Sequence, residues 1–174
     1  MTPKEQVNNA VNVFGLCVNL QEAILSGRIA PETFRKSVKI DTGGKGVTIR
    51  NNYTQEALRV QSKNLLFTAL GTTAIVIDTA LDAVLGSKKP ADTSQVGSAR
   101  AIIYMLRCAF AHDMAFPVWS CKNKYQLQYT VNLPQLGRIV FDAKALNGQN
   151  LKLEHIGGLE AYVELIEFCK GLIP

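Results

Sequence analysis

Apolar residues recur at helical spacing in several long stretches of the chain. In the first stretch, Val7, Val11, Phe14 and Val18 follow one another at intervals of three or four residues, which places them on one helix face. Gly27 follows as a helix stop signal. Three later stretches carry a comparable apolar periodicity. We therefore predict main helices over residues 3–26, 53–85, 93–117 and 157–172.

The stretch over residues 53–85 is apolar on nearly every side, which is typical of a helix at the centre of a bundle. Asp78 interrupts this apolar run. A buried carboxylate requires a partner, because its charge is costly away from water. Arg107 or His112 of the next predicted helix can supply that partner. The alternative is that Asp78 lies half exposed at the surface.

Two other regions alternate apolar and polar residues, which is the period of a β-strand. Residues 38–40 and 47–49 alternate on either side of a glycine-rich segment, and this pattern predicts a β-hairpin. A second alternation begins at Tyr125 and predicts further strands within residues 121–153. The predicted fold is one mainly α domain over residues 1–174, a helical bundle with small antiparallel β-hairpin appendages.

A small polar cluster interrupts the apolar helix that precedes Pro117. Arg107, Cys108 and His112 lie within six residues of one another. Cys108 and His112 are four residues apart and should be neighbours on one face, whereas Arg107 is about 140° around the axis from His112. Because a proline disfavours helical geometry in the residue before it, Pro117 limits the helix and His112 falls in about its last turn. A helix C-terminus favours a protonated imidazole.

The segment Arg107-Cys108-Ala109-Phe110-Ala111-His112 resembles the R-x(4–6)-H motif of HEPN domains. That resemblance implies an all-α bundle in which the motif ends a helix. It also implies a metal-independent ribonuclease that acts as a homodimer through the motif helix. Arg107 and His112 would be catalytic, Cys108 occupies a motif position where a more polar residue is usual, and Asp78 is the auxiliary acidic candidate.

The net charge indicates a class of binding partner, and the cysteines indicate a cellular compartment. The formal net charge is +5, which favours an anionic partner such as nucleic acid. The N-terminus lacks the pattern of a secretory signal, and the scattered cysteines favour a cytoplasmic protein with reduced thiols. Asp78 and Asp82 argue against a membrane span within residues 65–85, since each costs about 2.5–3.5 kcal/mol at a bilayer centre.

The resemblance to HEPN domains implies an endoribonuclease that needs neither a cofactor nor a metal. Histidine suits proton transfer near neutral pH, and arginine supplies fixed charge to phosphate oxygens. The reaction needs two proton transfers, and each chain has one motif histidine. A symmetric dimer would supply two such histidines. Resemblance alone suggests a toxin–antitoxin or phage-defence role, with any antitoxin or sensor being a separate protein.

Several alternatives stay open. The chain could be a non-catalytic HEPN module that binds RNA, nucleotide or a protein partner. Cys108 and His112 could act as a nucleophile and its base, as in thiol hydrolases. Cys108, His112 and Cys121 could ligate zinc, although a fourth ligand is missing. Finally, Arg107 and His112 could be structural and pair with Asp78 in a core network.

Overall fold

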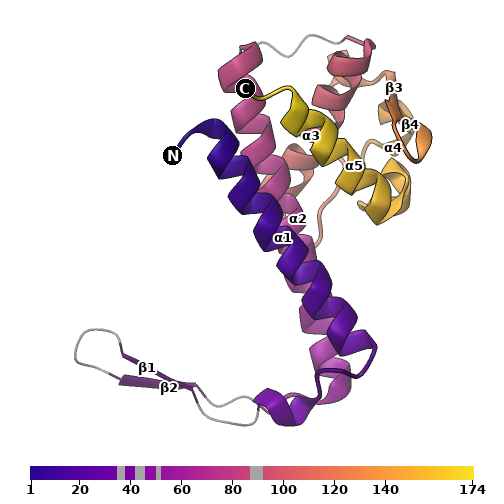
Figure 1. The fold of residues 1–174 in the computed structure, drawn as a ribbon. Helices are drawn as coiled ribbons and strands as arrows, with labels where there is room; N and C mark the ends of the chain where they lie inside the picture. Colours follow the sequence, from indigo (N-terminus) through magenta and orange to yellow (C-terminus); the bar gives the residue numbers. More distant parts are fainter. Residues whose placement is uncertain (35–37, 42–45, 50–51, 87–91) are drawn as a thin grey trace.

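Two long antiparallel helices form the spine of the molecule, α1 (Pro3–Leu25) and α2 (Gln55–Leu85) (Figure 1). The computed structural model describes residues 1–34, 38–41, 46–49, 52–86 and 92–174. Two further helices, α3 (Gln95–His112) and α5 (Gly158–Gly171), pack near the C-terminal end of α2. The predicted mainly helical fold with small antiparallel hairpins is confirmed.

α1 begins at a capping box and packs along α2. The Thr2 hydroxyl accepts a hydrogen bond from the Glu5 N–H, and the Glu5 carboxylate accepts one from the Thr2 N–H. The buried side chains of α1 lie on one face at heptad-like spacing, and they are Val7, Phe14, Cys17 and Ile24. This face turns towards α2, so the helix is amphipathic rather than buried all round.

α2 is the central helix that its apolar sequence predicts. The Thr54 hydroxyl caps it by accepting a hydrogen bond from the Ala57 N–H at 3.1 Å. By length and composition α2 could cross a membrane, but 56% of its most apolar window is buried by the protein itself. A mostly buried core helix of a soluble protein gives the same signal.

A close approach between α2 and α3 occurs at Gly71. A Cβ atom at Gly71 would lie 2.6 Å from Cγ of the buried Phe110 and 3.0 Å from Sδ of Met114. The absence of a side chain at Gly71 therefore lets Phe110 and Met114, near the C-terminal end of α3, pack directly on the α2 backbone. Tyr162 of α5 adds a second tie, because its hydroxyl donates to the Leu70 carbonyl at 2.9 Å.

The C-terminal hairpin, β3 (Gln128–Leu133) and β4 (Gly137–Asp142), packs against α3. The two strands are antiparallel with Tyr129 opposite Phe141, and both of these side chains are buried. The hairpin is tied to α3 through Ser98, whose hydroxyl accepts from the Thr130 N–H at 3.3 Å. The core thus extends from α2 across α3 to the hairpin.

The first hairpin, β1 (Val38–Asp41) and β2 (Gly46–Ile49), is antiparallel as predicted. It follows a short 3-10 helix, η1 (Pro31–Phe34), and projects from the end of the α1–α2 pair that lies away from α3 (Figure 1). The glycine-rich segment between its strands lies mostly outside the described residues.

The strand predicted from Tyr125 is wrong at its start. Tyr125 ends a 3-10 helix, η2 (Asn123–Tyr125), and its buried ring packs 5.3 Å from the ring of Tyr104. After β4 the chain forms a short helix, α4 (Ala143–Leu146), where further strand was expected. The Asp142 carboxylate caps α4 by accepting from the Ala145 N–H at 3.0 Å. A 3-10 helix, η3 (Leu153–Ile156), then leads into α5.

Candidate functional site

The motif helix α3 ends at His112, which confirms that this residue lies in the last turn. Its end differs from the prediction, because the helix stops five residues before Pro117. The Asp113 carboxylate accepts hydrogen bonds from the N–H groups of Ala115 and Phe116 at 2.8 and 2.9 Å. Asp113 itself has an extended backbone, with φ −151°. A side-chain turn at Asp113 therefore ends the helix before the proline acts.

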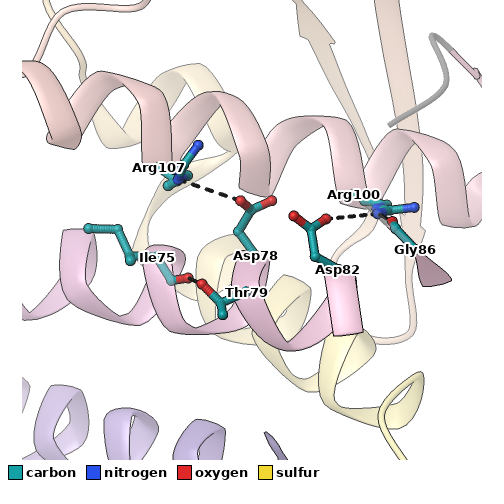
Figure 2. A network of polar contacts seen from close by, with 7 residues as sticks. All are labelled: Ile75, Asp78, Thr79, Asp82, Gly86, Arg100 and Arg107. Carbon is teal, nitrogen blue, oxygen red and sulfur yellow. Dashed lines mark hydrogen bonds and ion pairs between the residues drawn. The ribbon is translucent and has the colours of Figure 1, made fainter. Parts of the chain in front are cut away.

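Arg107 and Asp78 form an ion pair between α3 and α2. The distance from Arg107 Nε to Asp78 Oδ2 is 3.6 Å (Figure 2). The Asp78 side chain is 3% exposed, whereas the Arg107 side chain is 42% exposed. The alternative of a half-exposed Asp78 is thereby wrong, and the predicted partnership with Arg107 is present. At 3.6 Å the contact is a charge interaction rather than a hydrogen bond.

The geometry of this pair leaves part of the guanidinium directed to solvent. The ion pair engages the Nε side of the group, and Figure 2 shows the tip of Arg107 pointing away from Asp78. Within the described parts of the chain, no ion pair involves the terminal amino groups of Arg107. A half-exposed guanidinium held by a buried carboxylate is pre-oriented to bind an anion such as a phosphate.

A second ion pair, which sequence reasoning missed, lies further along the same two helices. Arg100 Nη2 donates to Asp82 Oδ1 at 2.8 Å, and it also contacts the Gly86 carbonyl at the end of α2 (Figure 2). Arg100 is 5% exposed. Arg100 and Arg107 are two turns apart on α3, and Asp78 and Asp82 are one turn apart on α2. The spacing of the two arginines and of the two aspartates could have indicated from the sequence that ion pairs join α2 and α3.

Tyr104 lies near Arg107 on α3, and the Cys108 thiol lies beside Tyr104. The guanidinium carbon lies 6.0 Å from the centre of the Tyr104 ring, at the outer range of a cation–π contact. Burial first, and then a hydrogen bond with Cys108, raises the pKa of Tyr104 to about 12. Burial and the charge of Cys108 also raise the pKa of the Cys121 thiol, to about 11. Both groups are therefore neutral at physiological pH.

Cys108 lies half buried beside Tyr104, one turn earlier on the same helix. The prediction that Cys108 and His112 are neighbours follows from their spacing, but the contact found for Cys108 is with Tyr104. In the described part of the chain, no hydrogen bond joins Cys108 to His112. Since a thiol nucleophile needs its base within hydrogen-bond reach, this arrangement does not favour the thiol hydrolase alternative.

His112 is exposed at the C-terminal end of α3. Its imidazole has no ion pair or hydrogen bond with Arg107 or Asp78 among the described residues. The structure thus brings Arg107 and Asp78 together, places Cys108 beside Tyr104, and leaves His112 at the surface five residues after Arg107. This exposure does not favour a core network that includes His112. It leaves the imidazole open to a substrate or to a second copy of the chain.

The other histidine, His155, occupies a structural position. The Trp119 indole N–H donates to His155 Nδ1 at 2.8 Å, and the Lys152 N–H approaches the same nitrogen at 3.4 Å. Trp119 is almost completely buried and packs on Phe141 with ring centres 4.8 Å apart. His155 therefore orients a core tryptophan.

No metal-binding group of three His, Cys, Asp or Glu side chains comes together within the ranges that the structure describes. Cys108, His112 and Cys121 are therefore not gathered in that part of the chain as zinc ligands would be. The four cysteines are free thiols, and only Cys108 among them is partly exposed.

Comparison with known proteins gives no match to any family model, any curated protein or any solved structure. The function proposed for this chain therefore rests on the motif and on the geometry around Arg107.

Proposed function

We propose that this protein is a metal-independent endoribonuclease of the HEPN type, in which Arg107 and His112 act on the scissile phosphate. The observation that carries the proposal is the Arg107–Asp78 pair. A buried carboxylate on α2 holds an arginine whose outer end stays exposed, five residues before an exposed histidine at a helix end. The resemblance of residues 107–112 to the HEPN motif supplies the reaction class.

The proposed reaction uses the 2′-hydroxyl of the RNA as its nucleophile. One His112 imidazole accepts the proton of the 2′-hydroxyl, and the 2′ oxygen attacks the adjacent phosphorus. The bond from phosphorus to the 5′ oxygen breaks, and a second imidazole donates a proton to that leaving oxygen. Arg107 donates hydrogen bonds to the phosphate oxygens and offsets the charge that develops on them. The products are a 2′,3′-cyclic phosphate and a 5′-hydroxyl.

Two imidazoles per reaction imply a homodimer, because each chain supplies a single motif histidine. The exposed end of α3 is where two copies would have to meet to combine their Arg107 and His112 side chains. The proposed enzyme is an RNA-cleaving toxin or phage-defence effector controlled by a separate protein. Its cleavage rate per chain should fall when dilution below the dimer dissociation constant separates the subunits.

End-group analysis tests the proposal. RNA is incubated with the wild-type protein in excess EDTA, and the new ends are characterised. We expect cleavage that survives EDTA and yields cyclic phosphate and 5′-hydroxyl ends. Products with 5′-phosphate ends, or cleavage that appears only with added Mg²⁺, would contradict the proposal, since the chemistry would then use water and a metal.

A second candidate function is a non-catalytic HEPN module that binds RNA, nucleotide or a protein partner. The position of Cys108 favours it, because this motif position faces Tyr104 and offers no polar side chain to the surface near His112. A folded dimer that binds RNA but leaves every tested strand uncut in EDTA and in Mg²⁺ would favour this candidate.

A further inference from the structure

A groove of about 380 Å³ lies beside the end of the motif helix. One wall belongs to α2, through Lys63, Asn64 and Phe67. The opposite wall is the segment that follows α3, including Phe116, and Asn150 closes one side. The volume falls within the range of about 300–1,000 Å³ that is usual for small-ligand sites.

The groove is connected to the motif through packed side chains. The Phe67 ring meets the Phe110 ring edge to face, with centres 6.4 Å apart, and Phe110 lies two residues before His112. Phe116 lies four residues after His112, in the turn that the Asp113 carboxylate holds. A ligand that extends from the groove along α3 would therefore pass the end of the helix that carries His112.

The walls of the groove are held by backbone hydrogen bonds. The Leu151 N–H donates to the Pro117 carbonyl at 2.8 Å, and Val118 and Asn150 form an isolated antiparallel bridge. These contacts fix the segment after α3 against the chain near Asn150. Phe116 is nonetheless 78% exposed, although it is a large aromatic side chain next to a fixed backbone. Such a ring offers a free face on which a ligand can stack.

The chemistry of the lining fits a nucleotide. Phe67 and Phe116 supply aromatic surface for a base, and Lys63 supplies a positive charge for a phosphate. The amide groups of Asn64 and Asn150 can each donate and accept hydrogen bonds at a base edge. Among the described residues, no carboxylate lines the groove to repel an anion. By contrast, a groove of about 400 Å³ between α1 and α2 is lined by uncharged side chains.

We propose that this groove binds one unpaired base of single-stranded RNA, with the base stacked on Phe116 and an adjoining phosphate contacted by Lys63. This inference rests on the proposed ribonuclease function and adds to it a site that selects unpaired RNA. The stacked base fixes where the strand crosses the end of α3, and thus which phosphate reaches His112. Double-stranded RNA lacks a free base face and is excluded from the groove.

The test uses binding, so that its outcome does not depend on cleavage. The probe is a short fluorescein-labelled single strand of mixed sequence with 2′-fluoro sugars, which lacks the nucleophile and stays intact. Fluorescence anisotropy measures its dissociation constant for the wild-type protein and for Phe116→Ala, with Phe116→Tyr as the variant that keeps the aromatic face. Leu136→Ala removes an apolar side chain that is 44% exposed at the tip of the β3–β4 hairpin, and it is the control.

We expect Phe116→Ala to weaken binding by roughly 5- to 150-fold, the range for loss of one base–aromatic stack. Phe116→Tyr and Leu136→Ala should bind as the wild type does. Lys63→Ala should lower the slope of log affinity against log salt by about 0.7, the value for one phosphate contact on a single strand. Lys4→Ala removes the same charge near the N-terminus of α1 and should leave that slope unchanged.

Equal affinity of the wild type and Phe116→Ala for the probe would overturn the groove proposal, even if the wild type cleaves RNA. Loss of binding accompanied by dissociation of a dimer, measured by light scattering, would also overturn it, because Phe116 would then belong to a protein interface. If the protein cuts no RNA but binds the probe in a way that depends on Phe116, the groove proposal is supported and the proposed ribonuclease function is contradicted.

Discussion

Asp78 and Arg107 form an ion pair with unequal burial, in which the carboxylate is 3% exposed and the guanidinium side chain is 42% exposed. Removing the arginine takes a cation away from a buried charge, whereas removing the carboxylate leaves an arginine that water can reach. We expect Arg107→Met to lower the free energy of unfolding by about 1–3 kcal/mol. Asp78→Asn should cost less, about 1 kcal/mol or below.

Urea unfolding followed by circular dichroism measures this asymmetry, and the variants should share the slope of the wild type. Val163→Ala, a partly exposed position on α5, controls for the loss of exposed apolar surface. Equal losses in the two variants, or a larger loss in Asp78→Asn, would show that Arg107 does not compensate the charge of Asp78.

Gly71→Ala should destabilise the protein although alanine is the better helix former. The added Cβ would lie 2.6 Å from Cγ of Phe110, a ring that is buried and cannot swing aside freely. Overpacking costs about 1–3 kcal/mol, while the gain in helix propensity is about 1 kcal/mol at most. We expect a lower thermal midpoint for Gly71→Ala. Gly15→Ala is the control, because a Cβ there meets no atom within 4 Å and should raise the midpoint.

The stability of the fold should depend on the protonation of His155. Burial first, and then the charge of Lys152, lowers the pKa of His155 from 6.5, and Glu154 opposes this only in part. The folded state therefore binds fewer protons than the unfolded state just below pH 6.5. The stabilisation is complete above that pH and is lost as the pH falls through the folded pKa. Protonation would also remove the Nδ1 acceptor of the Trp119 N–H.

Denaturant unfolding at a series of pH values from neutral to mildly acidic measures this contribution. The difference in free energy of unfolding between the wild type and His155→Gln should shrink as the pH falls through that window. A constant difference across the series would contradict the prediction. His112→Gln serves as the comparison, because it replaces the exposed histidine.

The sequence predicted those elements whose cause is local. The apolar character of α2 on nearly every side and the alternation of β1 and β2 each depend on residues close together in the chain. The cost of a buried lone charge made Arg107 or His112 a candidate partner for Asp78, with a half-exposed Asp78 as the alternative, and the structure pairs Asp78 with Arg107. These predictions, which rest on local patterns or on a large energetic penalty, hold in the folded structure.

The remaining features depend on packing that a single sequence does not reveal. Arg100 and Asp82 are eighteen residues apart, and their pairing requires the register between α2 and α3. Tyr125 begins an alternating pattern that is typical of a strand. In the structure its ring packs near the Tyr104 ring, and its backbone belongs to a 3-10 helix. The prediction took Pro117 alone as the limit of α3 and did not consider Asp113, whose carboxylate accepts the hydrogen bonds that follow the helix end.

The role of the motif itself is tested most directly by RNA cleavage in excess EDTA, with wild type, Arg107→Ala and His112→Ala compared. Each protein is first shown by circular dichroism and light scattering to keep its fold and its oligomeric state. Arg138→Ala, which removes a charge exposed on β4, is the control. We predict that both motif variants lose cleavage by about 100-fold or more and that Arg138→Ala cleaves as the wild type does. Cleavage by folded His112→Ala at the wild-type rate would contradict the proposed mechanism.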